Sequence, residues 1–179
     1  MQGIDQGIVL FFQSVRCEPL TDLFSVFIPL EFWNVVIVVL VLVTFYRART
    51  LRVPLVSFLL AKRLSDFSYG LLKPLVHRPR PFLTVKELGP LITPHGFSFP
   101  SGHATVAMAM AVVLAHHFPK ARALVYVLAG LIGASRVYFG VHYLSDVLAG
   151  FVLGVAVGYL CILLEKVILS VNKGVDLRS

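Results

Sequence analysis

The chain has 179 residues, of which 58% are hydrophobic and 14% charged, with a mean hydropathy of +0.86. Soluble domains are about 45–50% apolar and roughly 25% charged, so this composition excludes an ordinary soluble domain and an intrinsically disordered chain. With 13 glycines, 10 prolines and 2 cysteines, collagen-like and disulfide-rich classes are excluded as well. We predict one all-α domain over residues 1–179, a polytopic transmembrane helical bundle, in which the net charge of +7 must occupy particular places.

Residues 4–15 are expected to form an amphipathic helix that is too short to span and lies at the membrane interface. No basic segment precedes this helix, so no cleaved signal peptide is expected. Cys17 and Cys161 would lie at different depths of the bundle and are expected to stay unpaired. Spans need ~20 apolar residues to cross ~30 Å of hydrocarbon, and about five stretches approach that length. We predict spans at 23–46, 53–72, 101–117, 121–138 and 145–169.

The placement of lysine and arginine predicts the orientation, because these residues are enriched in cytoplasmic connections. The more numerous set comprises Arg47, Arg49, Arg52, Lys120, Arg122, Lys166, Lys173 and Arg178. The opposite set comprises Arg16, Lys73, Arg78, Arg80, Lys86 and Arg136. We therefore expect a multi-pass protein of the cytoplasmic (inner) membrane. Its N-terminus and the long connection 73–100 would face the periplasm or cell exterior.

Three charged residues fall near the middle of the second predicted span: Lys62, Arg63 and Asp66. Charges at that depth are costly and usually face a protein interior or a cavity. Lys62 and Asp66 are four residues apart, which is the spacing of an intrahelical ion pair. The alternative is a polar stripe beneath a site, because Asp66 and Lys73 share one helix face.

Three motifs combine basic, histidine and serine residues, and the predicted spans bring all three to the same membrane face. The motifs are Lys73 with Arg80-Pro81, Pro100-Ser101-Gly102-His103, and Ser135-Arg136 with His142 and Asp146.

The cations of these motifs suit a phosphate group. Arg80 and Arg136 carry guanidinium groups that bind phosphate oxygens in pairs, whereas Lys73 acts as a point charge. Ser101 is a favoured N-cap residue, a helix N-terminus attracts anions, and Gly102 lets the backbone approach a ligand closely. The sequence therefore predicts a pocket for a tetrahedral oxyanion.

His142 and Asp146 are one helical turn apart, so the carboxylate can accept the N–H of one imidazole nitrogen and leave the other free to attack. His103 could then protonate the leaving oxygen. The alternatives for these residues are a structural hydrogen bond and a transition-metal site. The neighbouring cations argue against the metal site, because they would repel a metal ion.

The chain resembles the type-2 phosphatidic acid phosphatase superfamily of membrane lipid phosphatases. Its motifs match the K-x6-R-P, P-S-G-H and S-R-x5-H-x3-D pattern of that family at every fixed position of residues 73–146. The resemblance implies His142 as nucleophile, Asp146 as its orienting partner and His103 as general acid. It also implies that the phosphoryl oxygens are held by Lys73, Arg80, Ser101, Gly102 and Arg136. Pro81, Pro100 and Ser135 would shape the site. His77 and Arg78 are not fixed motif positions and are expected to line the loop, with contact to a lipid headgroup as the alternative.

The resemblance further implies hydrolysis of a phosphomonoester or diphosphate with no metal and no cofactor. The expected partners are the membrane and a lipid substrate, with no nucleic acid. Candidate substrates are undecaprenyl diphosphate, phosphatidylglycerol phosphate, phosphatidic acid and the 1-phosphate of lipid A. A phosphotransferase that passes the group to another lipid is the main alternative, and a phosphate or lipid transporter is a further one.

Overall fold

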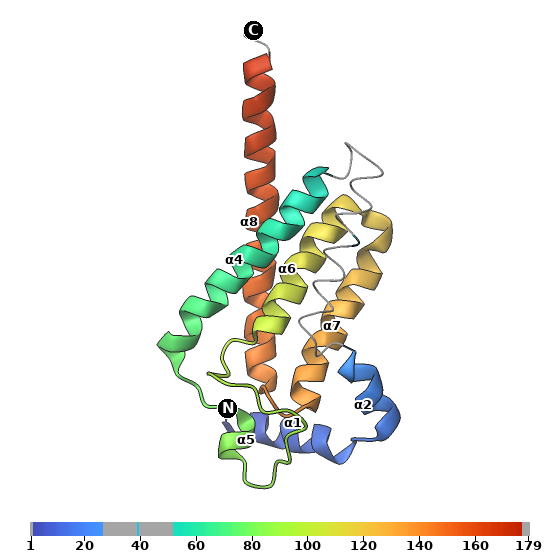
Figure 1. Cartoon of the computed structure of the whole chain (residues 1–179), viewed down its shortest axis with the longest axis vertical. Coiled ribbons are helices and arrows are strands. Elements are labelled where there is room, and N and C mark those ends of the chain that lie inside the picture. Colours follow the sequence, from blue (N-terminus) through green and yellow to red (C-terminus); the bar gives the residue numbers. More distant parts are fainter. Residues whose placement is uncertain (1, 27–38, 40–51, 177–179) are drawn as a thin grey trace.

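The computed structural model describes residues 2–26, 39 and 52–176, and every regular element within those ranges is helical. The helices are α1 (Gln2–Ser14), α2 (Glu18–Ser25), α4 (Arg52–Val76), α5 (Pro81–Thr84), α6 (Gly102–His117), η1 (Pro119–Ala121), α7 (Arg122–Tyr138) and α8 (Leu144–Asp176). Figure 1 shows α4, α6, α7 and α8 as a bundle, with α1 and α5 at the end opposite the C-terminus. The predicted all-α class is confirmed.

Helices are present where four of the five spans were predicted, and α1 matches the expected amphipathic helix. The predicted span 23–46 lies mostly outside the described residues, and its first residues belong instead to α2, where Pro19 starts a separate short helix. Two helical segments of the described chain, Pro119–Tyr138 and Leu144–Ser170, are long and apolar enough to cross a membrane. The 16 residues of α6 fall short of the usual length, and α4 contains the charges around Lys62. The number of spans therefore stays a prediction.

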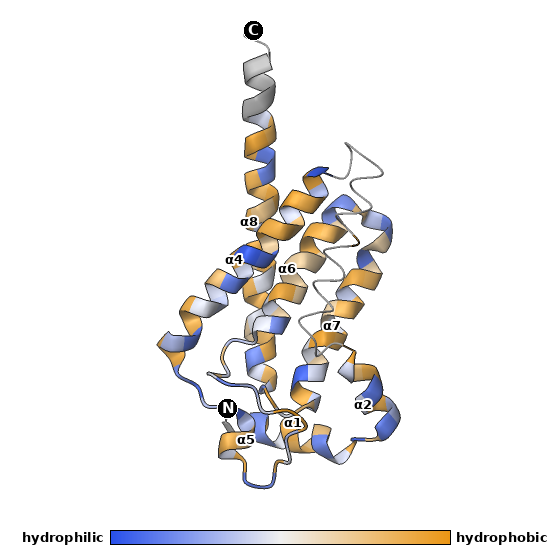
Figure 2. Cartoon of the chain, viewed as in Figure 1, coloured by the Kyte–Doolittle hydropathy of each residue, from blue (hydrophilic) through white to orange (hydrophobic). Residues whose placement is uncertain are grey.

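The helices expose large apolar side chains, which are normally buried in a soluble protein. Val152 of α8 exposes 72% of its surface and Phe67 of α4 exposes 64%, and Val127 of α7 is similarly open. Figure 2 shows hydrophobic residues along the outer faces of these helices. Many exposed large apolar side chains on the helices of one bundle suit contact with lipid.

The core of the bundle is α6, which packs against α4, α7 and α8. Most of its side chains are small or β-branched, and Ala104, Thr105 and Ala109 are fully buried. Gly150, Gly154 and Gly158 form the matching face of α8, and a Cβ atom on any of them would come within 3.0 Å of α6 or of the residue that precedes it. Small residues at a spacing of four let two helix backbones approach closely.

We expect Gly154→Val to destabilise the bundle, because an added Cβ would lie 2.4 Å from the carbonyl oxygen of Thr105. Overpacking of this kind costs about 1–3 kcal/mol, and thermal denaturation in detergent should show the loss. Gly70→Val is the matched control, since its Cβ would have no neighbour within 4 Å. Equal melting temperatures for the two variants would contradict this account of the α6–α8 contact.

The N-terminal helices are attached to α7 through Tyr138. The Arg16 guanidinium donates hydrogen bonds of 3.0 and 2.8 Å to the carbonyl oxygen of Tyr138. The Tyr138 hydroxyl lies 2.7 Å from the hydroxyl of Thr21, and its ring packs edge-on against Phe24 of α2. Cys17 and Cys161 are both free, as predicted.

Candidate active site

The first motif begins on α4 and continues into the loop beyond it. Lys73 lies in the last turn of α4 and donates a 2.7 Å hydrogen bond from Nζ to the carbonyl oxygen of Phe97. Arg80 is buried and donates to the carbonyl oxygens of Gly96, Val141 and His95 at 2.9, 3.0 and 3.1 Å. The backbone of the two loops thus holds the guanidinium in one orientation.

The second motif starts α6. Ser101 occupies the expected N-cap position with an extended backbone, but its hydroxyl makes no capping hydrogen bond. Ser101 Oγ and His103 Nε2 are buried without a hydrogen-bond partner among the described residues. The backbone amides in the first turn of a helix have no partner within the helix. The start of α6 therefore combines these amides with two side-chain atoms that can still form hydrogen bonds.

The third motif spans the turn from α7 to α8. Gly140 adopts a φ of +73°, which glycine tolerates readily, and this turn places His142 two residues before α8. His142 therefore lies outside the helix, although one helical turn was expected to join it to Asp146. Its side chain still faces Asp146. Its Nδ1 lies 3.6 Å from Asp146 Oδ2, which is too long for a hydrogen bond. Catalytic hydrogen bonds are often this loose in a ligand-free protein.

Sequence reasoning missed Ser98, whose hydroxyl lies between those two groups. Ser98 Oγ is 3.3 Å from His142 Nδ1 and donates a short hydrogen bond to Asp146 Oδ2. The hydroxyl can accept the Nδ1 proton while donating its own, so it links the imidazole to the carboxylate. His142 Nε2 is thereby left facing Arg80, at 3.4 Å from Nη1.

The role of Arg78 was also missed, because it was expected to line the loop or to meet a lipid headgroup. Its Nη1 donates to Asp146 Oδ1 at 2.6 Å, and its guanidinium lies 4.1 Å from the ring centre of Tyr143. The backbone N–H of Tyr143 donates to Asp146 Oδ2 at 2.9 Å. Arg78 is separated from Arg80 only by Pro79, and that basic doublet is the signal that could have found it.

Arg136 lies in the last turn of α7, behind this group, and is 2% exposed. Its Nε donates to Ser135 Oγ at 3.0 Å and its guanidinium lies 5.5 Å from the ring centre of Phe139. Its carbonyl oxygen accepts the backbone N–H groups of Val141 and His142. Arg136 therefore also fixes the backbone that carries the imidazole.

A cavity of about 230 Å³ joins the motifs and extends along α4. It is lined by Lys62, Asp66, Tyr69, Lys73, Arg80, Gly102, His103, Val106 and His142. Of the predicted site residues, Ser101, Arg136 and Asp146 are buried beside the cavity and not among those that line it.

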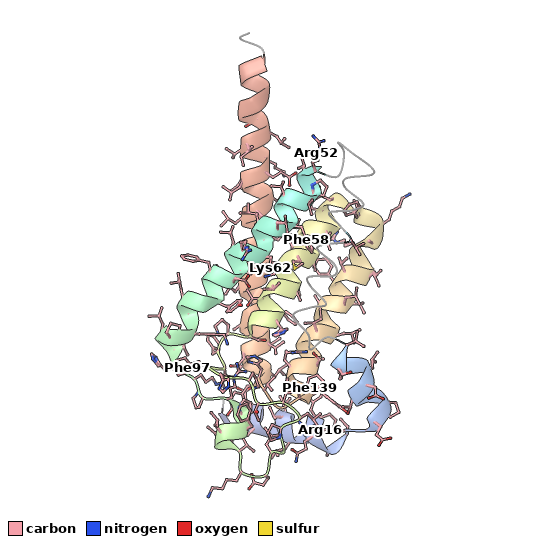
Figure 3. The ribbon with its side chains drawn as sticks, viewed as in Figure 1. Arg16, Arg52, Phe58, Lys62, Phe97 and Phe139 are labelled. Carbon is pink, nitrogen blue, oxygen red and sulfur yellow. The ribbon has the colours of Figure 1, made fainter. Side chains whose placement is uncertain are left out.

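The charges within α4 form an ion pair that also borders this cavity. Lys62 Nζ lies 2.9 Å from Asp66 Oδ2, and Asp66 Oδ1 accepts a hydrogen bond from the Tyr69 hydroxyl. The two interpretations of this pair, an intrahelical ion pair and a polar stripe below the site, therefore both hold. Figure 3 shows Lys62 midway along α4, between Arg52 and the end near Phe97.

Burial is the main reason that the pKa of His142 is lowered to about 4. Asp146 opposes this shift, while Arg80 and Lys73 add to it. The imidazole is therefore neutral at physiological pH, as a nucleophile has to be. The pKa of Arg80 is also lowered by burial, with Asp146 acting in the opposite direction.

We expect the imidazole of His142 to stay neutral when the pH is lowered from 8 to 5, because its pKa is about 4. NMR of histidine-labelled protein in detergent, with His142→Gln used to assign the signal, measures this directly. A midpoint near the ordinary histidine value of about 6.5 would contradict the buried, cation-flanked environment.

The model of the PAP2 superfamily matches residues 54–168, which include all three motifs and most of the bundle. The chain belongs to this superfamily.

A solved structure described as the first transmembrane PAP2 type phosphatidylglycerolphosphate phosphatase, from Bacillus subtilis, superposes with a TM-score of 0.75. It is 30% identical and the match covers 93% of this chain and 87% of that one. The structure of LpxE from Aquifex aeolicus is 27% identical, with a TM-score of 0.75 and coverage of 87% and 93%. The predicted class of transmembrane helical bundle is thereby confirmed.

Curated relatives match over shorter stretches. Phosphatidylglycerophosphatase B of Bacillus subtilis is 41% identical over 100 residues, covering 50% of this chain and 47% of the relative. Undecaprenyl-diphosphatase of Sulfolobus acidocaldarius is 36% identical over 128 residues, covering 70% and 60%. Lipid A 1-phosphatase of Rhizobium etli is 44% identical over 57 residues, covering 32% and 25%. The chain thus spans about half the length of the first of these relatives and three fifths of the second.

Proposed function

We propose that the protein is a membrane lipid phosphatase that hydrolyses a phosphate monoester or diphosphate on a lipid headgroup through a phosphohistidine. The observation that carries this proposal is the cavity in which Lys73, Arg80, His103 and His142 meet. Two cations and two imidazoles on one small cavity provide charge for phosphoryl oxygens together with a nucleophile and an acid.

His142 Nε2 is the proposed nucleophile, because Nδ1 is directed to Ser98 and Asp146. Attack forms the bond from Nε2 to phosphorus and breaks the bond from phosphorus to the lipid oxygen. The imidazole becomes cationic on phosphorylation, and the carboxylate of Asp146 stabilises that charge.

His103 is the proposed general acid for the leaving oxygen. His103 lines the cavity, and its Nε2 is buried with no protein partner among the described residues. The negative charge of the bound phosphate favours a proton on this imidazole, and the proton passes to the lipid oxygen as the phosphoryl group leaves. The neutral His103 then accepts a proton from the water that hydrolyses the phosphohistidine.

The proposed cradle for the phosphoryl oxygens consists of Lys73, Arg80 and Arg136 with Ser101 Oγ and the backbone at Gly102. Charge stabilisation at these oxygens is the main task in phosphoryl transfer, and one strong preorganised donor is worth on the order of 3 kcal/mol. The unused hydroxyl of Ser101 supports its place in this set.

The membrane face is proposed from the two ends of the bundle. The site and α1 share one end, whereas Arg52, Lys120 and Arg122 lie at the ends of helices on the other. Basic residues favour the cytoplasmic side, so the site would face the periplasm or cell exterior of an inner membrane. The names of the relatives support three lipid classes as substrates: phosphatidylglycerophosphate, undecaprenyl diphosphate and lipid A.

We expect His142→Ala to abolish phosphate release from every one of these lipids while the protein stays folded, because the variant lacks the attacking nitrogen. Released phosphate from a panel of the lipids in detergent is the measurement, and His116→Ala, at an exposed position near the other end of α6, is the control. Phosphate release by His142→Ala at the wild-type rate would exclude this nucleophile. Transfer of labelled phosphate to a second lipid would instead identify a phosphotransferase.

Activity should survive chelation with EDTA, because the proposed cradle stabilises the phosphoryl charge with protein cations. Phosphate release before and after chelation, followed by addition of single divalent ions, is the test. A loss that one ion restores would support the metal-site alternative for His103, His142 and Asp146.

A further inference from the structure

Asp5 of α1 is a carboxylate with an unusual position for an amphipathic interfacial helix, because it is only 6% exposed. Its Oδ1 accepts the backbone N–H of Ser145 at 3.1 Å, and its Oδ2 accepts the Ser145 hydroxyl at 2.5 Å. Ser145 lies in the first turn of α8, where backbone N–H groups have no partner within the helix. Asp5 therefore acts as a cap supplied from another helix.

The same carboxylate reaches the reaction centre through one guanidinium. Arg78 Nη2 donates to Asp5 Oδ2 at 2.8 Å, and Arg78 Nη1 donates to Asp146 Oδ1 at 2.6 Å and to Ser145 Oγ at 2.7 Å. The guanidinium also stacks on Tyr143 at 4.1 Å. Arg78 is thus held between two carboxylates, and each of its contacts leads to the turn that carries His142 and Asp146.

The charges of this chain of contacts alternate. Burial alone would raise the pKa of Asp5, but hydrogen bonds from Ser145 and Arg78 lower it, so the carboxylate is ionised. If Asp146 were the only carboxylate beside Arg78, the positive charge of Arg78 would cancel the negative charge of Asp146. A phosphorylated imidazole of His142 would then lack the negative charge that stabilises it. The second carboxylate offsets Arg78, so the group Asp5, Arg78 and Asp146 keeps one net negative charge next to His142.

We propose that Asp5 is a positioning residue of the reaction centre, which acts through Arg78 to hold and electrostatically balance the carboxylate of Asp146. Helix α1 is then part of the catalytic apparatus as well as an interfacial helix. This inference rests on the proposed phosphatase function for its kinetic consequence, whereas its structural consequence at His142 does not depend on activity.

The kinetic test uses Asp5→Asn, which removes the charge and keeps the shape. We expect kcat to fall about tenfold to a hundredfold with KM within about twofold, because substrate contacts are unchanged while the phosphorylated state is less stabilised. The substrates are phosphatidylglycerol phosphate in vesicles and soluble p-nitrophenyl phosphate. If α1 served only to bind the membrane, Asp5→Asn would lower the rate with vesicles and leave the rate with p-nitrophenyl phosphate unchanged. That result would overturn the proposal.

A double-variant cycle tests the route through Arg78. In the background of Arg78→Gln, the added Asp5→Asn change should have no further effect on kcat. Equal multiplicative losses in both backgrounds would show that Asp5 acts independently of Arg78 and would contradict the proposal. Asp22→Asn, an exposed acidic residue on α2, is the matched control and should leave kcat unchanged.

A third measurement does not need activity. The ¹⁵N chemical shift of His142 Nδ1 should change in Asp5→Asn and stay constant in Asp22→Asn. An unchanged shift would overturn the positioning role, whatever the assays show.

The shift also separates the two proposals. If neither wild type nor variant releases phosphate but the shift changes, the proposed function is overturned and the positioning role remains supported. If Asp5→Asn melts below the assay temperature, Arg78→Lys breaks the same bridge and carries the same expectations.

Discussion

The buried carboxylate of Asp146 is the interaction on which the rest of the site depends. The carboxylate accepts hydrogen bonds from Ser98, Arg78 and the backbone N–H of Tyr143. The backbone carbonyl oxygen of Asp146 accepts the backbone N–H of Ser101. One residue at the start of α8 thus fixes the loop before α6, the loop after α4 and the turn after α7. An ionised group with 0% exposure is tolerable only because each oxygen is satisfied in this way.

The close contact of α6 and α8 makes this arrangement rigid. The glycines of α8 let the helix backbones touch, so Ser101 and Asp146, at the starts of these two helices, are held at a fixed separation. Lys73 is carried by α4, which also contributes Lys62, Asp66 and Tyr69 to the cavity wall. The proposed phosphate cradle is therefore built on the rigid pair α6 and α8, and α4 forms a further wall of its cavity.

Sequence reasoning could place the helices and the cavity-lining motif residues, because hydropathy runs and fixed spacings are local signals. It could not find the roles of Ser98 and Asp5, whose partners lie 44 and 140 residues away along the chain, whereas the doublet with Arg80 was a local signal for Arg78. Ser101 takes the expected N-cap position but makes no capping hydrogen bond, and His142 lies before α8 although its spacing to Asp146 is that of one helical turn. Both differences have the same reason. Both residues lie just before a helix starts, where tertiary contacts rather than helix geometry decide the orientation of a side chain.

The contact between Asp5 and Ser145 also constrains the order in which the protein can be assembled. Synthesis delivers α1 first and the start of α8 long afterwards, because Asp5 and Ser145 are 140 positions apart in the chain. Placing a charged Asp5 in hydrocarbon is costly. We therefore expect α1 to remain at the water-facing surface until α8 is inserted. A partly inserted chain without α8 would contain Lys73 and His103 but not Asp146, so the proposed reaction centre would form only when α8 is added.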